Sequence, residues 1–211
     1  DMLRLGLNIE HHVLPELYLS FLFNQSGALV KWYRDTFARA EARDRGDVYE
    51  QLAAEMPTEP TRLLVLPHFL PPMWPRYIAD SAGVIVGLRT TTTRGEILKA
   101  IMESTTLYFV ESVAALRALG INTTRFVTSG GGAKSDYWLQ IKADVFGVPF
   151  ERLCNTDGSV AGAAMLAGIA TGLFADANEA VACCVRRDRT FVPNDRRHAQ
   201  YREKHEHYRK I

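Results

Sequence analysis

The sequence of 211 residues predicts an α/β fold, and the order of its apolar and helix-favouring segments supports that prediction. Short apolar runs that favour strands alternate with segments that favour helices, and such alternation is typical of α/β domains. The clearest example lies within residues 125–153. It consists of a strand over 125–128, a tight glycine turn over 129–133, a helix over 134–146 and a strand over 150–153. Gly147 and Pro149 end this helix, since glycine and proline commonly follow a helix C-terminus.

Residues 17–88 are expected to hold three strands, a helix and a charged insertion. The strands are predicted where apolar residues cluster, at 17–23, 63–66 and 83–88. A turn at 24–27 precedes a helix over 28–37. Residues 36–62 are rich in charge and alanine, which predicts a helical insertion followed by a loop. The prolines of 67–75 exclude regular structure there.

A long central helix is predicted over residues 97–119. Thr93 and Glu96 match a capping box, in which a hydroxyl and a carboxylate satisfy backbone N–H groups at the start of a helix. Apolar residues recur at helical spacing along the segment, and Gly120 provides a C-terminal cap. We interpret the apolar stripe as core packing.

The C-terminal quarter is expected to be mostly helical. Asp157 is predicted to cap a helix of small residues over 160–173, which could pack closely against a sheet or another helix. A further helical turn is expected over 176–181, and a polar tail helix within 195–211.

Composition argues against several functional classes. The chain has 25 Lys and Arg against 24 Asp and Glu, so its charge gives no reason to expect nucleic acid or a membrane as partner. Three cysteines without metal-ligand spacing favour a reduced, cytoplasmic protein, and the adjacent Cys183 and Cys184 are expected to be buried thiols. His205 and His207 lie two residues apart on a helix and do not share a face, so no metal site is predicted. The chain begins with Asp instead of Met, and residues are expected to be missing upstream.

The glycine turn is the best candidate for a binding site. A strand that leads into Gly130, Gly131 and Gly132 and then a helix suits an anion or a nucleotide, because glycine lets a ligand approach the backbone and a helix N-terminus offers free N–H groups. Many such turns simply join a strand to a helix. A P-loop is excluded because Ala133 precedes Lys134, where a P-loop requires glycine. A dinucleotide fingerprint fails as well, since its third glycine would fall on a serine.

Several strings of the sequence, taken in order, point to one family. They are residues 27–35, 64–68, 83–98, 129–147, 157–168 and 191–201. The string at 129–147, which begins Ser-Gly-Gly-Gly-Ala-Lys-Ser-Asp, closely resembles the adenine-side loop and helix of the FGGY carbohydrate kinases. From about Val13 onward the chain is similar to the C-terminal domain of this family, with a lean toward xylulokinase-like members over glycerol kinases.

The resemblance implies a ribonuclease-H-like domain of the actin and hexokinase type, incomplete at its N-terminal edge. It implies one C-terminal nucleotide-binding domain over 1–211, with 36–62 as the charged helical insertion and 195–211 as the tail helix. It also implies six nucleotide-binding residues, which are Gly27, Lys31, Gly131, Gly132, Ala133 and Asp136. Glycerol kinases have Gln in place of Lys31, so that residue departs from their pattern.

The activity implied by the resemblance is ATP-dependent phosphorylation of a hydroxyl of a sugar, ketose or polyol, with Mg²⁺. This chain would supply the nucleotide-side half, and the sugar would bind through a missing N-terminal domain. No catalytic residue is assigned, because Asp1 lacks the flanking glycines of the family's catalytic segment, and the chain alone is expected to be inactive. A homodimer is possible through an unpaired sheet edge. The alternative is a binding or regulatory domain that keeps the fold without kinase activity.

Overall fold

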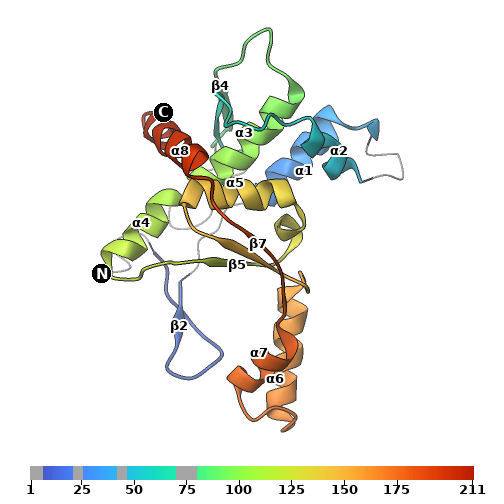
Figure 1. Cartoon of the computed structure of the whole chain (residues 1–211), viewed down its shortest axis with the longest axis vertical. Helices are drawn as coiled ribbons and strands as arrows, with labels where there is room; N and C mark the ends of the chain where they lie inside the picture. The colour runs from blue at the N-terminus through green and yellow to red at the C-terminus, as the bar shows by residue number, and fades with distance from the viewer. Residues whose placement is uncertain (1–6, 21–25, 42–46, 70–79) are drawn as a thin grey trace. The chain divides into compact units, whose positions relative to one another are not determined.

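The structure is a computed structural model that describes residues 7–20, 26–41, 47–69 and 80–211. Backbone contacts group the chain into two compact units. One combines Asp1–Thr123 with Arg196–Ile211, and the other spans Thr124–Asp195. Figure 1 shows the elements of both units, coloured by position along the chain. The expectation of a single domain over 1–211 stays a prediction.

The second unit is built on a three-stranded sheet in the order β5-β6-β7. The strands are β5 (Phe126–Thr128), β6 (Phe150–Leu153) and β7 (Arg187–Phe191). β5 and β6 run parallel, with Phe126 opposite Phe150, while β7 runs antiparallel to β6. The strands at 125–128 and 150–153 were predicted. β7 was not predicted. Its first four residues, Arg-Asp-Arg-Thr, are polar and exposed, and only Phe191 is buried, so the strand shows no apolar pattern.

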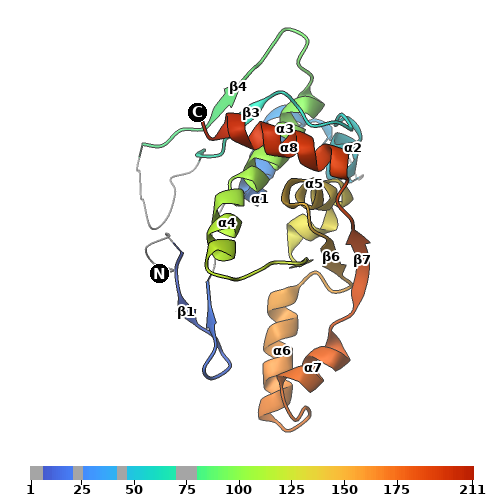
Figure 2. The same cartoon turned by 60° about the vertical axis from the view of Figure 1, so that its left-hand side comes forward.

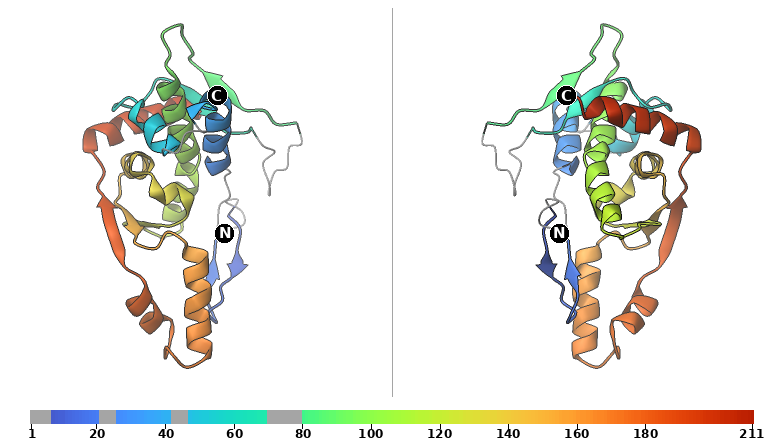
Figure 3. Two further views of the ribbon diagram at one scale, coloured as in Figure 1. Left: turned by 90° about the vertical axis from the view of Figure 1, so that its right-hand side faces the viewer. Right: turned by 90° about the vertical axis from the view of Figure 1, so that its left-hand side faces the viewer.

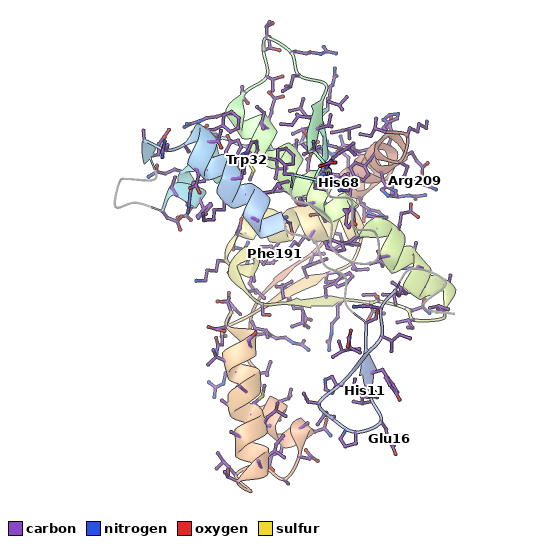
Figure 4. The ribbon with its side chains drawn as sticks, turned by 180° about the vertical axis from the view of Figure 1, so that it is seen from behind. His11, Glu16, Trp32, His68, Phe191 and Arg209 are labelled. Atoms are coloured by element: carbon purple, nitrogen blue, oxygen red, sulfur yellow. The ribbon has the colours of Figure 1, made fainter. Side chains whose placement is uncertain are left out.

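Helix α5 (Asp136–Phe146) covers this sheet. The core between helix and sheet is formed by buried Leu139, Ala143, Phe150 and Phe191, with Phe126, Phe146 and Val148 packed around them. Figure 4 labels Phe191. The three phenylalanines of β5, β6 and the helix end lie with ring centroids 4.7–5.8 Å apart. Gly147 ends the helix in the left-handed conformation, as predicted, with φ of 66°.

Two further helices of the second unit follow β6. Helix α6 (Gly158–Ala170) is capped by Asp157, as expected, and α7 (Ala177–Cys184) is capped by Asp176. The two pack against each other, as Figure 2 shows. Cys183, Cys184 and Cys154 are free and exposed, so the expectation of buried thiols was wrong. The reason is that α7 buries only Ala180 among its residues.

The first unit is organised around α3 (Arg94–Leu107) and α4 (Val110–Ala118). The capping box of Thr93 and Glu96 is present, and the left-handed Gly120 follows α4 with φ of 81°. The single helix predicted over 97–119 is instead two helices. Thr105 and Thr106 donate hydrogen bonds back to the carbonyl groups of the preceding turn, an arrangement that bends helices, and the break follows directly after them.

Other elements of the first unit pack on α3. Helix α1 (Ser26–Phe37) runs alongside it, as Figure 3 shows, and α2 (Val48–Ala54) and the hairpin of β3 (Leu64–Leu66) with β4 (Val84–Val86) also contact it. These elements confirm the helix at 28–37 and the strands at 63–66 and 83–88, although the helix begins two residues earlier. Residues 67–69 form no helix or strand, and 70–75 lie outside the described residues.

The strand predicted at 17–23 is shorter in the structure. β1 (Glu10–His11) and β2 (Tyr18–Leu19) form a small antiparallel hairpin, and residues 21–25 lie outside the described part. Figure 4 labels Glu16 at the turn, whose φ of 61° is unusual for a residue other than glycine. The rings of His11 and Tyr18 lie 5.2 Å apart across the hairpin.

The tail helix α8 (Asp195–Tyr208) is fixed to the first unit by a buried ion pair. Lys204 donates to Glu103 of α3 at 2.5 Å, and both side chains are almost fully buried. Tyr201 and Thr61 also donate hydrogen bonds to the Glu103 carboxylate. Because every charge in this cluster has a partner, its burial is tolerated.

Candidate functional site

The candidate site lies where the parallel strands β5 and β6 end. Ligands of α/β proteins commonly bind at the carboxyl ends of parallel strands. Here the loop after β5 meets the loop after β6, because the Gly130 N–H donates to the carbonyl of Thr156 at 2.5 Å. Ser129 approaches Gly158 so closely that a Cβ on that glycine would lie 2.9 Å from its hydroxyl oxygen. The two loops therefore lie together at the carboxyl ends of β5 and β6.

The glycine loop itself leaves backbone donors open. Gly130 has φ of 84°, which favours glycine, and residues Gly131–Lys134 then form a 3₁₀ turn, η3. Among the described residues, none accepts a hydrogen bond from the N–H groups of Gly131 or Gly132. A Cβ on Gly130 or Gly131 would meet nothing within 4 Å. Adjacent free N–H groups beside open space are suited to an anion or a polar ligand.

The turn leads into α5 through Ser135, whose hydroxyl caps the helix by accepting from the N–H of Trp138. The expected helix start at 134 is thus two residues too early, since the chain completes a 3₁₀ turn first. Asp136 is the first residue of α5, where a carboxylate is favoured by the helix dipole.

The carboxylate of Asp136 is held by two arginines of the sheet. Arg152 of β6 binds one carboxylate oxygen at 2.5 Å, and Arg189 of β7 binds the other. Arg152 also donates to Asp188 at 2.5 Å, and both guanidinium groups lie over the ring of Phe191. This ion-pair network connects the start of α5 to two strands of the sheet.

One further charged group lies beside the loop. The ammonium of Lys142 lies over the indole ring of Trp138, 4.7 Å from a ring centroid, and 3.9 Å from the position that a Cβ on Gly132 would occupy. Burial lowers the pKa of Lys142. The sequence reading did not single out Lys142, Arg152 or Arg189. Lys142 and Arg152 carry a signal in the sequence, since both are positive charges on the two elements that follow the glycine turn. Arg189 carries no such signal, because β7 lies far along the chain.

The remaining predicted site residues lie in the first unit. Gly27 is an exposed residue of α1, and a Cβ there would meet nothing within 4 Å. Lys31 lies one turn later and donates to Asp35 at 3.2 Å. Hydrogen bonds from Arg34 and then Lys31 lower the pKa of Asp35. The structure therefore brings Gly131, Gly132, Ala133 and Asp136 together in one turn, while Gly27 and Lys31 form a separate pair on α1.

The described residues hold no group of three or more His, Cys, Asp or Glu side chains that could bind a metal ion. In that same part of the chain, no helix is both long and apolar enough to cross a membrane.

The sequence matches a known family over most of its length. The profile of the FGGY family of carbohydrate kinases, C-terminal domain, matches residues 8–171. The chain belongs to this family. Among relatives, a xylulose kinase of Bacillus subtilis is 31% identical over 88% of this chain, and a glycerol kinase of Oleidesulfovibrio alaskensis is 34% identical over 85%. The crystal structure of xylulose kinase from Rhodospirillum rubrum, 29% identical, superposes over 97% of this chain with a TM-score of 0.75.

These comparisons confirm the fold class for this FGGY domain, which is the ribonuclease-H-like fold of actin and hexokinase. The chain spans only part of each relative. It covers 37% of the Bacillus subtilis xylulose kinase, 35% of the Oleidesulfovibrio alaskensis glycerol kinase and 41% of the Rhodospirillum rubrum structure.

Proposed function

We propose that this FGGY domain forms the nucleotide-side half of an ATP-dependent kinase that phosphorylates a hydroxyl of a sugar, ketose or polyol. The observation that carries the proposal is the glycine loop at the end of β5. No described residue accepts a hydrogen bond from the N–H groups of Gly131 and Gly132, and a Cβ on Gly131 would meet open space. Family membership supports the reaction type, since the named relatives are sugar and polyol kinases.

The residues of the loop fit a nucleotide. Glycine at these positions allows close approach of a base, ribose or phosphate to the backbone, and the free N–H groups donate to its oxygens or nitrogens. Asp136 is proposed as a nucleotide-binding residue at the start of α5, and its pairing with Arg152 and Arg189 supports a second role in positioning the loop. Gly27 and Lys31 are proposed as a second nucleotide-flanking element on α1.

The substrate class is proposed from the relatives, with xylulose-like ketoses favoured over glycerol by the Rhodospirillum rubrum structure that matches nearly the whole chain. Mg²⁺ is the metal that ATP-dependent phosphoryl transfer employs to neutralise phosphate charge. The described residues offer no carboxylate cluster for such an ion, so no residue of this chain is assigned to it.

The test is a calorimetric titration of the chain with ADP, beside a Gly131→Trp variant. Because a Cβ at Gly131 would meet no atom within 4 Å, we expect the indole to extend into the proposed ligand space. We expect the unsubstituted chain to bind ADP and the variant to lose this binding. Equal binding by both proteins would place the nucleotide elsewhere, and an unsubstituted chain that binds no nucleotide would favour the alternative of a domain without kinase function.

The pair on α1 is tested in the same way with Gly27→Trp, which also projects into open space. Weaker ADP binding in this variant would support Gly27 and Lys31 as nucleotide neighbours. Unchanged binding, together with loss in Gly131→Trp, would confine the site to the glycine loop.

A further inference from the structure

Lys142 differs from the other lysines whose pKa burial lowers. Lys99 donates to two backbone carbonyl groups, at 2.6 and 2.8 Å, and Lys204 donates to a carboxylate and to Thr61. Among the described residues, none accepts a hydrogen bond from the Lys142 ammonium, and none forms an ion pair with it.

An ammonium withdrawn from water without an acceptor is unfavourable, since burial of a charge costs free energy unless partners replace the lost water. The Trp138 ring offsets part of this cost, because an aromatic face attracts a cation. It cannot accept the three N–H bonds that an ammonium offers. The half-buried ammonium therefore has donor positions that an oxygen-bearing group beside it can occupy.

The position of the ammonium indicates what that group is. Its nitrogen lies 3.9 Å from the Cβ position of Gly132, whose N–H group is itself without an acceptor among the described residues. The ammonium and the glycine loop thus border the same few ångströms of space. An anionic oxygen there would satisfy a charged donor and a backbone donor together.

We propose that Lys142 is a binding residue for phosphate oxygens of the nucleotide received at the Gly130–Ala133 loop. The inference rests on the nucleotide-binding function proposed above, and it assigns a specific part of the ligand to a specific side chain. The Lys142 ammonium lies against the Trp138 ring, and a Cβ on Gly132 would stand in ordinary contact with both groups, 3.5 Å from the ring and 3.9 Å from the ammonium.

The opposing explanation is that Lys142 only packs against Trp138. The two explanations differ for ligands with and without phosphate. If Lys142 contacts phosphate, its replacement weakens the binding of ADP and leaves the binding of adenosine unchanged. If Lys142 only packs against Trp138, its replacement disturbs the loop and weakens the binding of both ligands alike.

The experiment compares titrations of ADP and adenosine into the unsubstituted chain, Lys142→Met and Lys134→Met. Methionine keeps much of the lysine stem against Trp138 and removes the charge, and Lys134 is a matched control because it is an exposed lysine in the same turn. We expect Lys142→Met to weaken ADP about tenfold or more, as for loss of a charged hydrogen bond. Adenosine should bind Lys142→Met as before, and Lys134→Met should bind both ligands as before.

Three results would overturn the inference. Equal weakening of ADP and adenosine in Lys142→Met would show a packing role, and unchanged ADP affinity would show no contact. If the unsubstituted chain bound neither ligand, the proposed function would fail and this inference with it. A Lys142→Arg variant is a second control in case the methionine variant misfolds. It keeps the positive charge and should retain most of the ADP affinity.

Discussion

The N–H group of Gly130 donates to the carbonyl oxygen of Thr156 at 2.5 Å, and this bond joins the loops that follow β5 and β6. The donor residue has φ of 84°, a conformation that side-chain-bearing residues rarely adopt. The glycine loop therefore depends on one residue for both its shape and its attachment to the neighbouring strand.

Gly130→Ala should destabilise the second unit. With φ of 84° and ψ of −176°, Gly130 occupies a backbone region that is essentially confined to glycine. Holding another residue there costs about 1–3 kcal/mol, so the free energy of unfolding should fall by about that amount. Gly131→Ala is the matched control, because Gly131 has no left-handed φ and its Cβ would meet nothing within 4 Å. Urea denaturation of both variants tests the prediction, and an equal loss in the two would contradict it.

Asp136→Asn should weaken the attachment of α5 to the sheet. The substitution removes the charge that binds Arg152 and Arg189, and since these groups are partly exposed we expect a loss of no more than about 1 kcal/mol. ADP affinity should fall as well, because the start of α5 is no longer fixed. Asp188→Asn, which loses a single contact with Arg152, serves as the control. A drop in ADP affinity of the same size in the control would argue against a positioning role for Asp136.

Lys204→Met should be among the most destabilising substitutions in the first unit. It leaves the buried Glu103 carboxylate without its cation, and breaking a buried ion pair costs about 3–5 kcal/mol. Arg196→Met removes an exposed pair with Glu59 and should leave the unfolding midpoint unchanged within error. Chemical denaturation monitored by circular dichroism compares the two. Similar midpoints for both variants would show that the buried pair adds little.

We expect His205 to make the stability of the first unit depend on pH. Burial lowers the pKa of His205 below its ordinary 6.5, although Glu111, 3.6 Å away, opposes the shift. Figure 4 labels the neighbouring Arg209, which also binds Glu111. The unfolded chain therefore takes up this proton at a higher pH than the folded chain. Stability contributed by neutral His205 is present above pH 6.5 and is lost as the pH falls toward the folded pKa.

The measurement is urea denaturation at about pH 7.5 and about pH 5.5, a range in which histidine changes charge. His205→Gln should show a smaller difference between the two conditions than the unsubstituted chain. His207→Gln, a change at an exposed position on the same helix, should show the full difference. A His205→Gln variant with undiminished pH dependence would sink this explanation.

Much of the fold was predictable from local patterns. The capping box at Thr93, the left-handed Gly120 and Gly147, and the strands flanking the glycine turn each rest on a few neighbouring residues, and all are present. The break between α3 and α4 was missed, because an apolar stripe does not reveal that Thr105 and Thr106 bond back to their own helix. β7 was missed because an exposed edge strand carries little apolar pattern.

Only those residues of the candidate site that lie close together in the sequence were predictable. The glycine turn and Asp136 stand in one string, and the family resemblance found them. Arg189 lies 53 residues from Asp136, and only the pairing of β6 with β7 brings it near. Lys142 follows the turn closely, yet the sequence does not reveal that no described residue accepts a hydrogen bond from its ammonium, because this is a property of the folded environment.

Binding of a nucleotide at the glycine loop can be followed residue by residue with backbone amide NMR during a titration with ADP. The amide resonances of Gly131 and Gly132 should shift early and strongly, because their N–H groups would acquire an acceptor. Resonances of residues on α7 should stay in place. Shifts confined to other parts of the chain, with both glycine amides unchanged, would contradict the account.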